Sequence, residues 1–556
     1  MSVRRPAYLV AGLALTFLVL APLTSIDAAQ QAGLPLLTDK LWFRIATTVA
    51  MFVVMASAWN IIGGLTGYAS FGNVAFFGLG AYTAGVVVSN LNLPFALALV
   101  LAPLVAAAFA VIVGIPLLRL RGHYFAVATL GVGVAVGEVV NNIEPLGAAT
   151  GLFLPIIRSD LLFFYLMLGA ALLAVLTTWV ILRTRFGYGL LAIRENEEAA
   201  AVIGVNTTFY KVAAFCIAAA LTGIAGAIFA QWNSFINQDN AGRRGGLARA
   251  DHPDAGWRRL RLGVLSDRPR CLARRLRHLH SARRDRLLRR PKQTLAALFP
   301  ADVTRDQRMS LLAIRDVSKR FGGVNALAGV TFEVEQGDIL GIIGPNGAGK
   351  TTLLNCISGL YRPDAGDIRW ETASIRGLAP YRIARLGIGR TFQIVRPFPS
   401  MTVRENTAMG ALFGRPGARL QPGAALNEAD TVLDVVGLGE KRHYPVLRLT
   451  VPDRKRLEVA RALAMRPRLL LLDEVMAGLN QVEIEQALEM VRRVRDSGVT
   501  IVLIEHVMKV IVGVCRRALV LNFGRTLLEG PPAEVLKDRR VIEAYLGQRY
   551  AKDHEK

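Results

Sequence analysis

The chain has 556 residues, of which 53% are hydrophobic and 19% are charged, and its formal net charge is +24. It is too long for one hydrophobic core and too apolar for an ordinary soluble enzyme, so we expect two or more domains. Its four cysteines show no paired spacing, which supports neither a disulfide framework nor a zinc site.

The apolar residues are concentrated before Asn240, in stretches long enough, or nearly so, to cross a bilayer, which takes about 20 residues. We place seven spans near residues 7–28, 41–63, 68–90, 93–119, 123–141, 161–183 and 209–232. The third is rich in glycine, which also fits a broken or re-entrant segment. Arg4 and Arg5 precede the first span and predict a cytoplasmic N-terminus. Seven complete crossings would leave Asn240 on the opposite face, whereas an eighth crossing or a re-entrant third segment would not.

A polar interval, residues 184–208, separates the last two spans. Within it a charged run, Arg194–Glu198, leads into the apolar run Ala199–Gly204. A short helix with such a pattern can dock on a soluble partner. On composition alone we favour the alternative, which is a solvated loop.

From Met309 onward short β-branched strands alternate with helices, which predicts an α/β nucleotide-binding domain. A strand that ends at Ile343 runs directly into the glycine-rich segment Gly344–Thr352. Such a turn lets backbone N–H groups surround a polyphosphate, while Lys350 reaches the terminal phosphates and the Thr351 hydroxyl binds Mg²⁺. The residues that we expect to hold the phosphates are Gly344, Asn346, Gly347, Gly349, Lys350, Thr351 and Thr352.

Two adjacent carboxylates, Asp473 and Glu474, follow the apolar strand Leu469–Leu472. We expect Asp473 to hold Mg²⁺, with Thr351 as a further ligand. We expect Glu474 to polarise the water that attacks the γ-phosphate. A helix-capping loop would also explain adjacent acids after a strand, but it explains neither the long apolar run nor the phosphate loop upstream.

Three further side chains have positions that suit a nucleotide site. His506 follows the next strand and is expected to contact the γ-phosphate, although a lone histidine is usually structural. Gln393 is expected to sense both Mg²⁺ and the attacking water. Phe321 is expected to stack on adenine, although an aromatic residue in a strand more often belongs to the core.

The order of these motifs resembles the ATPase subunit of ABC transporters over residues about 309–550. Residues 472–480, 504–509 and 541–547 are similar to the branch that imports branched-chain amino acids. The first 240 residues resemble the permease of the same importers through residues 67–82, 120–124 and 192–204. In that family the last segment is a coupling helix that fits a groove on the ATPase. The resemblance therefore overturns the solvated-loop interpretation of residues 184–208.

One motif departs from the family pattern. The signature loop of these ATPases presents Ser and Gly to the ATP that the opposite subunit holds. Here the corresponding run is Leu449–Asp453, in which Thr450 keeps a hydroxyl and is our expected nucleotide contact. Pro452 occupies the glycine position and has no N–H to donate, although proline suits the first turn of a helix. We therefore hypothesise two unequal ATP sites, with hydrolysis dependent on the partner's signature loop.

Residues 241–300 contain 17 Lys and Arg against four Asp, which gives this segment a net charge of +13. It could be a basic linker on anionic lipid headgroups. A nucleic-acid-binding tail is a second interpretation, but interleaved aromatics and a recognised module are lacking. We favour a third, because reading residues 250–263 one base forward permits an apolar run and glycines like those expected in the permease. A frameshift would then have replaced the end of the permease.

The resemblance implies an all-α polytopic membrane domain at residues 1–240, an Arg-rich linker at 241–308 and an α/β P-loop ABC ATPase domain at 309–556. It implies ATP-driven import of branched-chain or related amino acids across the bacterial inner membrane, with ATP and Mg²⁺ and a cytoplasmic ATPase. The expected partners are a second permease, a second ATPase, a periplasmic binding protein and membrane lipid; nucleic acid is not expected. The alternative is a frameshifted fusion with a non-functional permease half and only ATPase activity.

Overall fold

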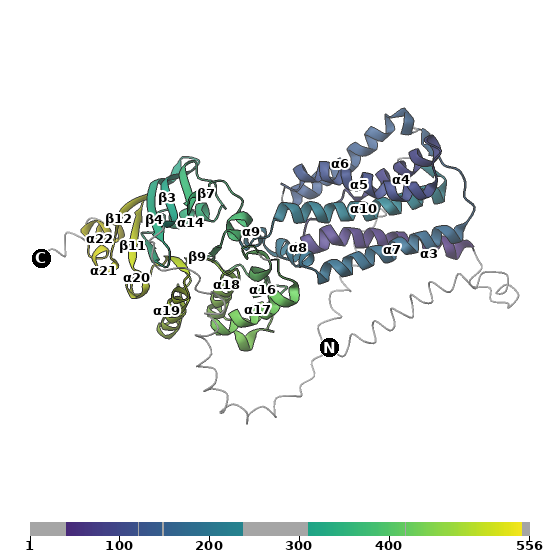
Figure 1. Ribbon diagram of the computed structural model, residues 1–556. Coiled ribbons are helices and arrows are strands. Elements are labelled where there is room, and N and C mark those ends of the chain that lie inside the picture. Colours follow the sequence, from purple (N-terminus) through teal and green to yellow (C-terminus); the bar gives the residue numbers. More distant parts are fainter. Residues whose placement is uncertain (1–39, 121, 147–149, 237–309, 418, 547–556) are drawn as a thin grey trace, which may run out of the picture. The chain divides into compact units, whose positions relative to one another are not determined.

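The computed structural model describes residues 40–120, 122–146, 150–236, 310–417 and 419–546 (Figure 1). They form two compact units. The first holds the described residues of Met1–Leu190 and Thr208–Ser266, and the second holds those of Leu191–Thr207 and Asp267–Lys556. The predicted first span, 7–28, and the Arg-rich segment lie outside the described residues. A segment between two spans, 191–207, thus belongs to the second unit.

Apolar helices build the first unit. They are α3 (Lys40–Trp59) continued by η2 (Asn60–Gly64), α4 (Asn73–Gly85) continued by η3 (Val86–Asn90), α5 (Phe95–Leu117), α6 (His123–Asn141), α7 (Asp160–Arg183) and α10 (Thr207–Asn233). The described residues contain five helices that are long and apolar enough to cross a membrane, at Phe43–Gly64, Phe95–Leu117, His123–Asn141, Asp160–Arg183 and Thr207–Asn233. The third predicted stretch gives the shorter helix α4, which is not among the five and follows non-helical residues 67–71.

Small residues let α10 approach its neighbours closely. A Cβ atom added to Gly80 of α4 would lie 2.1 Å from the carbonyl oxygen of Gly223 in α10, and one added to Gly226 would lie 2.0 Å from that of Phe77. On its other side Gly223 faces Ala102 and α5. Backbones can pack this closely only where side chains are absent, which is how helices associate in an apolar medium.

The second unit is centred on a six-stranded sheet in the order β12-β11-β5-β10-β9-β8. Its strands are β5 (Ile339–Ile343), β8 (Ile388–Arg390), β9 (Leu469–Asp473), β10 (Thr500–Ile504), β11 (Arg517–Asn522) and β12 (Arg525–Gly530). All neighbouring pairs are parallel except β11 and β12. Strands β5, β9 and β10 are buried along their whole length, as expected for parallel strands covered on both faces.

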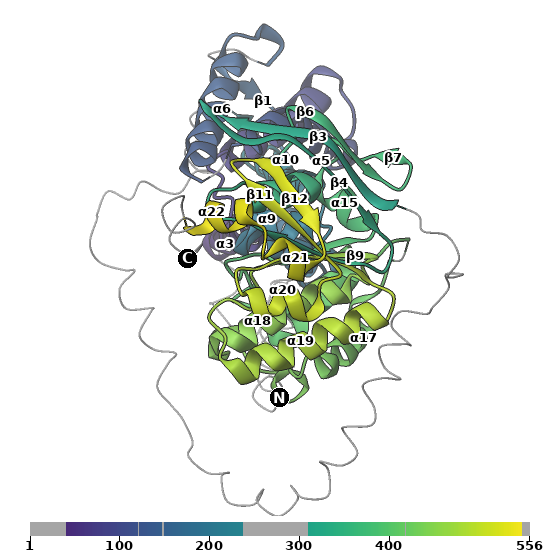
Figure 2. The same ribbon diagram turned by 90° about the vertical axis from the view of Figure 1, so that its left-hand side faces the viewer.

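An antiparallel sheet and a group of helices complete this unit (Figure 2). The sheet has the order β4-β3-β6-β7. Its strands are β3 (Ser310–Phe321), β4 (Val324–Glu335), β6 (Ala365–Trp370) and β7 (Ala373–Ser374). The helices are α14 (Lys350–Ile357), α15 (Pro380–Arg385), α16 (Val403–Phe413), α17 (Pro422–Val435), α18 (Val451–Ala464), α19 (Gln481–Asp496), α20 (Met508–Val514), α21 (Pro532–Val535) and α22 (Arg539–Leu546).

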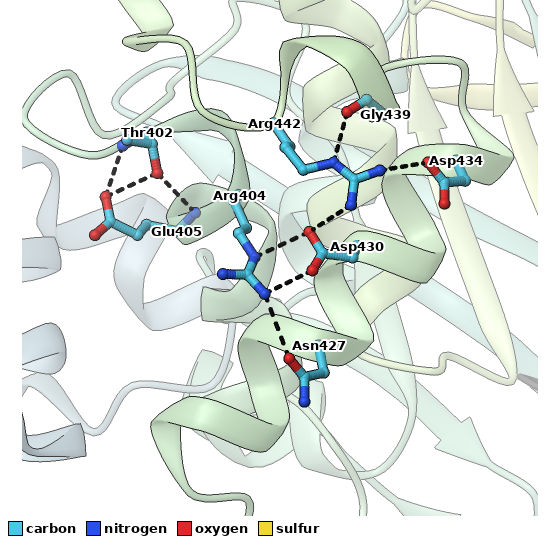
Figure 3. Close-up of polar contacts among 8 residues, drawn as sticks. All are labelled: Thr402, Arg404, Glu405, Asn427, Asp430, Asp434, Gly439 and Arg442. Atoms are coloured by element: carbon cyan, nitrogen blue, oxygen red, sulfur yellow. Dashed lines mark hydrogen bonds and ion pairs between the residues drawn. The ribbon is translucent and has the colours of Figure 1, made fainter.

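Helices α16, α17 and α18 pack on one another, and charged side chains fix the first pair (Figure 3). Thr402 and Glu405 form a capping box at the start of α16. In the same turn Arg404 binds both carboxylate oxygens of Asp430 in α17, at 2.9 and 2.6 Å. Arg442 adds a second ion pair to Asp430 at 3.3 Å. These contacts join the start of α16 and the segment after α17 to one carboxylate of α17.

The segment 191–207 folds as the end of α8 (Arg185–Glu195), helix α9 (Glu197–Val202) and a turn. Within the second unit α9 contacts α15. The Glu198 carboxylate forms an ion pair with Arg396 at 2.5 Å. The Gly204 carbonyl accepts a hydrogen bond from Arg385 at 3.2 Å, and a Cβ on Gly204 would lie 2.3 Å from the Phe413 carbonyl oxygen. This segment is therefore a docked helix, and the solvated loop that composition alone favours is wrong.

Candidate functional site

The glycine-rich segment forms a tight loop between β5 and α14. Gly347 and Gly349 have φ of 82° and 100°, a region that side chains other than glycine rarely adopt. At Gly349 an added Cβ would lie 2.4 Å from the carbonyl oxygen of Ala326. Of the predicted phosphate-binding residues, the loop holds Gly344, Asn346, Gly347 and Gly349, and the first turn of α14 holds Lys350, Thr351 and Thr352. The N–H groups at this helix start suit an anion.

Lys350 is nearly buried, with 6% of its surface exposed. Its ammonium group donates to the carbonyl oxygens of Gly344 at 2.6 Å and of Pro345 at 3.0 Å. Burial lowers the pKa of Lys350, and the nearby charges of Glu474 and Asp473 oppose that shift. The lysine is thus held beside both carboxylates by acceptors of the loop itself.

Glu474 accepts hydrogen bonds from two side chains of other elements. Its Oε1 lies 2.6 Å from Nε2 of His506, which follows β10. Its Oε2 accepts from Nε2 of Gln393 at 2.7 Å, in the loop after β8. Strands β8, β9 and β10 are neighbours, so their carboxyl ends bring together the three side chains predicted to be catalytic. A carboxylate oriented from both oxygens suits the role of polarising a water molecule.

Asp473 lies at the end of β9 and is 1% exposed. Beyond the guanidinium group of Arg390, 3.5 Å from Oδ2, the structure gives its carboxylate no hydrogen-bond partner. Burial raises the pKa of Asp473, and the charge of Arg390 opposes that shift. Asp473, Thr351 and Gln393, the three predicted metal ligands, line one pocket. Buried carboxylate oxygens beside a hydroxyl and an amide are a donor set that Mg²⁺ accepts.

Phe321 and Thr450 lie on other elements than the catalytic trio. Phe321 ends β3 with 43% of its surface exposed, and its ring lies edge-on to Tyr361 at 5.2 Å. Thr450 precedes α18, and its hydroxyl accepts from the backbone N–H of Asp453 at 3.4 Å. Pro452 occupies the first turn of α18 without breaking the helix. The role of Phe321 as an adenine contact and that of Thr450 as a nucleotide contact remain proposals.

Four residues of the site were not predicted from the sequence. Arg390 pairs with Asp473, and Tyr545 of α22 accepts a hydrogen bond from the N–H of Gly344 at 2.6 Å. Glu505 and Lys455 contact the segment that follows Glu474. Only Glu505 has a local signal in the sequence. It is an acid that directly follows an apolar strand and precedes His506, and acids are rarely buried.

The chain matches family models in both units. Residues 41–244 match the permease component of branched-chain amino acid transport systems. Residues 327–477 match the ABC transporter model, and residues 525–551 match that of the branched-chain amino acid ATP-binding cassette transporters. The two ATP-binding matches contain the phosphate loop and α22, respectively.

Similar proteins cover the second unit. The high-affinity branched-chain amino acid transport ATP-binding protein LivG of Salmonella typhimurium is 40% identical over 250 residues, which are 43% of this chain and 98% of that protein. LivG of Escherichia coli is 39% identical over the same length. BraF of Pseudomonas aeruginosa is 38% identical. A nucleotide-free crystal structure of an ATP-binding cassette from an ABC transporter is 30% identical, covers 43% of this chain and 100% of that chain, and has a TM-score of 0.40.

Proposed function

Because this chain belongs to the branched-chain amino acid ABC transporters and joins their permease and ATP-binding parts in one polypeptide, we propose that it imports branched-chain or related amino acids across the bacterial inner membrane at the expense of ATP. The observation that supports this most is the Glu474 carboxylate held by His506 and Gln393 beside a phosphate loop, in a chain whose first unit matches a permease.

The ATPase part binds ATP, and the phosphate loop is the proposed binding site. The terminal phosphates would replace the carbonyl oxygens of Gly344 and Pro345 as partners of the Lys350 ammonium group. Backbone N–H groups of the loop and of the first turn of α14 would hold the β-phosphate. Phe321 is 43% exposed and would stack on adenine beside its neighbours Tyr361 and Lys319.

Mg²⁺ is proposed on the chemistry of its ligands. Thr351, Gln393 and Asp473 would hold the ion, which neutralises charge that develops on the transferred phosphate. The described residues contain no cluster of three or more His, Cys, Asp or Glu side chains. Mg²⁺ bound together with a nucleotide needs no such cluster, because phosphate oxygens and water complete its coordination.

Hydrolysis is assigned to the residues at the ends of the parallel strands. Glu474 would orient the attacking water and accept its proton, since its two oxygens are already directed by His506 and Gln393. His506 would also contact the γ-phosphate. Opposite charges of Lys350 and the carboxylates would keep the reacting groups in one place.

Segment 191–207 is proposed to transmit nucleotide-dependent changes to the permease. Helix α9 contacts α15, and its Glu198 pairs with Arg396, three residues after Gln393. A change at Gln393 on hydrolysis would thus move a group that α9 holds. We propose that a second permease, a second ATPase, a periplasmic binding protein and membrane lipid complete the assembly, and that the ATPase faces the cytoplasm.

The proposal is tested by uptake of radiolabelled leucine into proteoliposomes that contain the chain, its partner subunits and ATP. We expect uptake that requires ATP and the binding protein. Glu474→Gln should lower ATP hydrolysis by about 10² to 10⁴-fold, because an amide is no general base, and should leave ATP binding intact. Uptake that persists without ATP, or an active Glu474→Gln variant, would contradict the proposal.

A further inference from the structure

The backbone at Glu474 has an unusual conformation for a residue other than glycine. Its φ is +49°, in the left-handed region that side chains disfavour. The N–H of Glu474 donates to the carbonyl oxygen of Ile504 at 2.9 Å, which ties the residue to β10 on its N-terminal side. Strained backbone persists only where the surrounding structure fixes it, so the C-terminal side must also be held.

Lys455 of α18 provides one such contact. Its ammonium group donates to the carbonyl oxygen of Glu474 at 3.3 Å and, by a short bond, to that of Ala477. One cation thus joins both ends of the segment 474–477. Lys455 is five residues after Thr450, on the helix that begins with the signature motif.

Glu505 provides the other contact. Its Oε1 accepts from the N–H of Met476 at 2.7 Å, in the middle of the same segment. The side chain is completely buried, and Oε2 has no hydrogen-bond partner. A buried carboxylate is costly unless a charge or donors compensate for it. The Met476 N–H and the opposite charge of Lys455 offset part of this cost, while burial still raises the pKa of Glu505.

We propose that Lys455 and Glu505 are positioning residues that together clamp the backbone of residues 474–477 and so fix the direction of the Glu474 carboxylate. The inference rests on the proposed role of Glu474 in ATP hydrolysis. Because Lys455 belongs to α18, displacement of that helix would release the carbonyl of Glu474 and misdirect its side chain. The clamp makes hydrolysis depend on the position of the signature helix of the same chain.

Protonation of Glu505 should weaken the clamp, because a neutral carboxyl group attracts neither Lys455 nor the Met476 N–H as strongly. Burial raises the pKa of Glu505 to about 7. The groups that face Glu505 from the elements around it are Lys455 of α18, Glu474 after β9, Cys515 after α20, and the backbone N–H groups of Met476 and His506. The rate of ATP hydrolysis should therefore rise as the pH passes through about 7. Other titrating groups would add their own effects to this rise.

The test measures kcat, KM and ATP affinity of the full-length chain in its assembled complex between pH 5.5 and 8.5, a window set about the pKa of Glu505. For Glu505→Gln we expect, at alkaline pH, a kcat lowered to the value that the unaltered protein shows at acidic pH, without the step near pH 7. Lys455→Met should lower kcat by roughly tenfold at unchanged KM, and Lys455→Arg should recover part of it, since a guanidinium group also donates to two carbonyls. Matched controls are Glu489→Gln on the exposed face of α19 and Lys537→Met after α21, which should behave as the unaltered protein.

The outcomes separate the clamp from the function on which it rests. ATP affinity unchanged in all variants shows that they are folded, and Lys455→Met, if it loses ATP binding, is replaced by Lys455→Arg. If Glu474→Gln is inactive while Lys455→Met and Glu505→Gln keep the normal kcat and pH profile, the clamp is wrong and the ATPase assignment stands. If Glu474→Gln still hydrolyses ATP, the assignment itself fails.

Discussion

The buried Glu505 carboxylate lowers the stability of the folded protein, in addition to its proposed role beside Glu474. Its pKa is about 7 when folded and near 4.5 when unfolded, so between these pH values the folded protein binds more protons. Folding stability must then fall as pH rises from about 4.5 to 7, and the cost is complete above 7. A shift of this size corresponds to about 3 kcal/mol.

We therefore predict that Glu505→Gln changes stability in a pH-dependent manner. The difference in unfolding free energy between variant and unaltered protein should grow in favour of the variant from pH 5 to pH 8, by up to about 3 kcal/mol. Thermal unfolding of the purified full-length chain, followed for the ATPase transition at several pH values, measures it. A difference that does not vary with pH would show that Glu505 is not buried as a titrating group.

At the scale of single residues, the sequence motifs predict part of the nucleotide site. Residues that follow a strand within one or two positions, such as Asp473, Glu474 and His506, can be placed from sequence because parallel strands end at one edge of a sheet. Tyr545 and Lys455 cannot, because each acts on backbone groups of another element, and their own surroundings in the sequence are those of ordinary amphipathic helices.

At the scale of elements, the first turn of α18 differs from the signature motif of the family. Pro452 has no N–H, and the N–H of Asp453 already donates to the Thr450 hydroxyl. Asp453 itself is nearly buried and pairs with Lys441. The first turn of this helix therefore offers fewer free donors to a phosphate than a glycine-containing turn would.

We predict from this that the two ATP sites of the assembly are unequal. Glu474→Gln should remove most ATPase activity, whereas the equivalent change in the partner ATPase should remove little, because that site depends on the α18 of this chain. Steady-state ATPase assays of the two singly altered complexes measure the asymmetry. Equal losses would refute it, and Pro452→Gly, which restores a donor, should raise the activity of the weaker site.

The sequence predicts the membrane spans better than it predicts helix α9, and the reason is physical. The long spans are strong signals because hydrocarbon demands about 20 apolar residues, and five appear as helices. Helix α9 was mistaken on composition, because its Glu197 and Glu198 have the pattern of a solvated loop. Its partner, Arg396, lies far along the chain, and only the family resemblance anticipated the docking.

At the scale of the whole molecule, the number of crossings decides the side on which the ATPase lies. Five described helices can cross a membrane, and α4 is not among them. If residues 7–28 cross and α4 does not, six crossings return the chain to the cytoplasmic side. An even number, counted from the expected cytoplasmic N-terminus, agrees with the proposal that the ATPase faces the cytoplasm.

We predict that residues 310–546 are cleaved by protease added to inside-out vesicles and protected in intact spheroplasts. Immunoblotting with an antibody against the ATPase part measures this, and a periplasmic marker protein controls for leakage. Protection in inside-out vesicles would place the ATPase on the wrong face and leave the import proposal without its energy source.

The frameshift interpretation concerns the Arg-rich segment, which lies outside the described residues. The match to the permease component ends at residue 244, four residues into that segment. Sequencing of the locus addresses the interpretation directly, since an intact frame relative to close relatives would exclude it.

The docked segment 191–207 gives the second unit an unusual construction. The chain leaves the first unit after Leu190 and returns to it at Thr208, so the second unit consists of two separate stretches of one polypeptide. A break anywhere between residues 237 and 309 would cut the covalent path between those stretches and leave the ion pair of Glu198 with Arg396 and the approach of Gly204 to Phe413 untouched. In genetic terms, the contacts that hold residues 191–207 in the second unit are those of a complementing fragment.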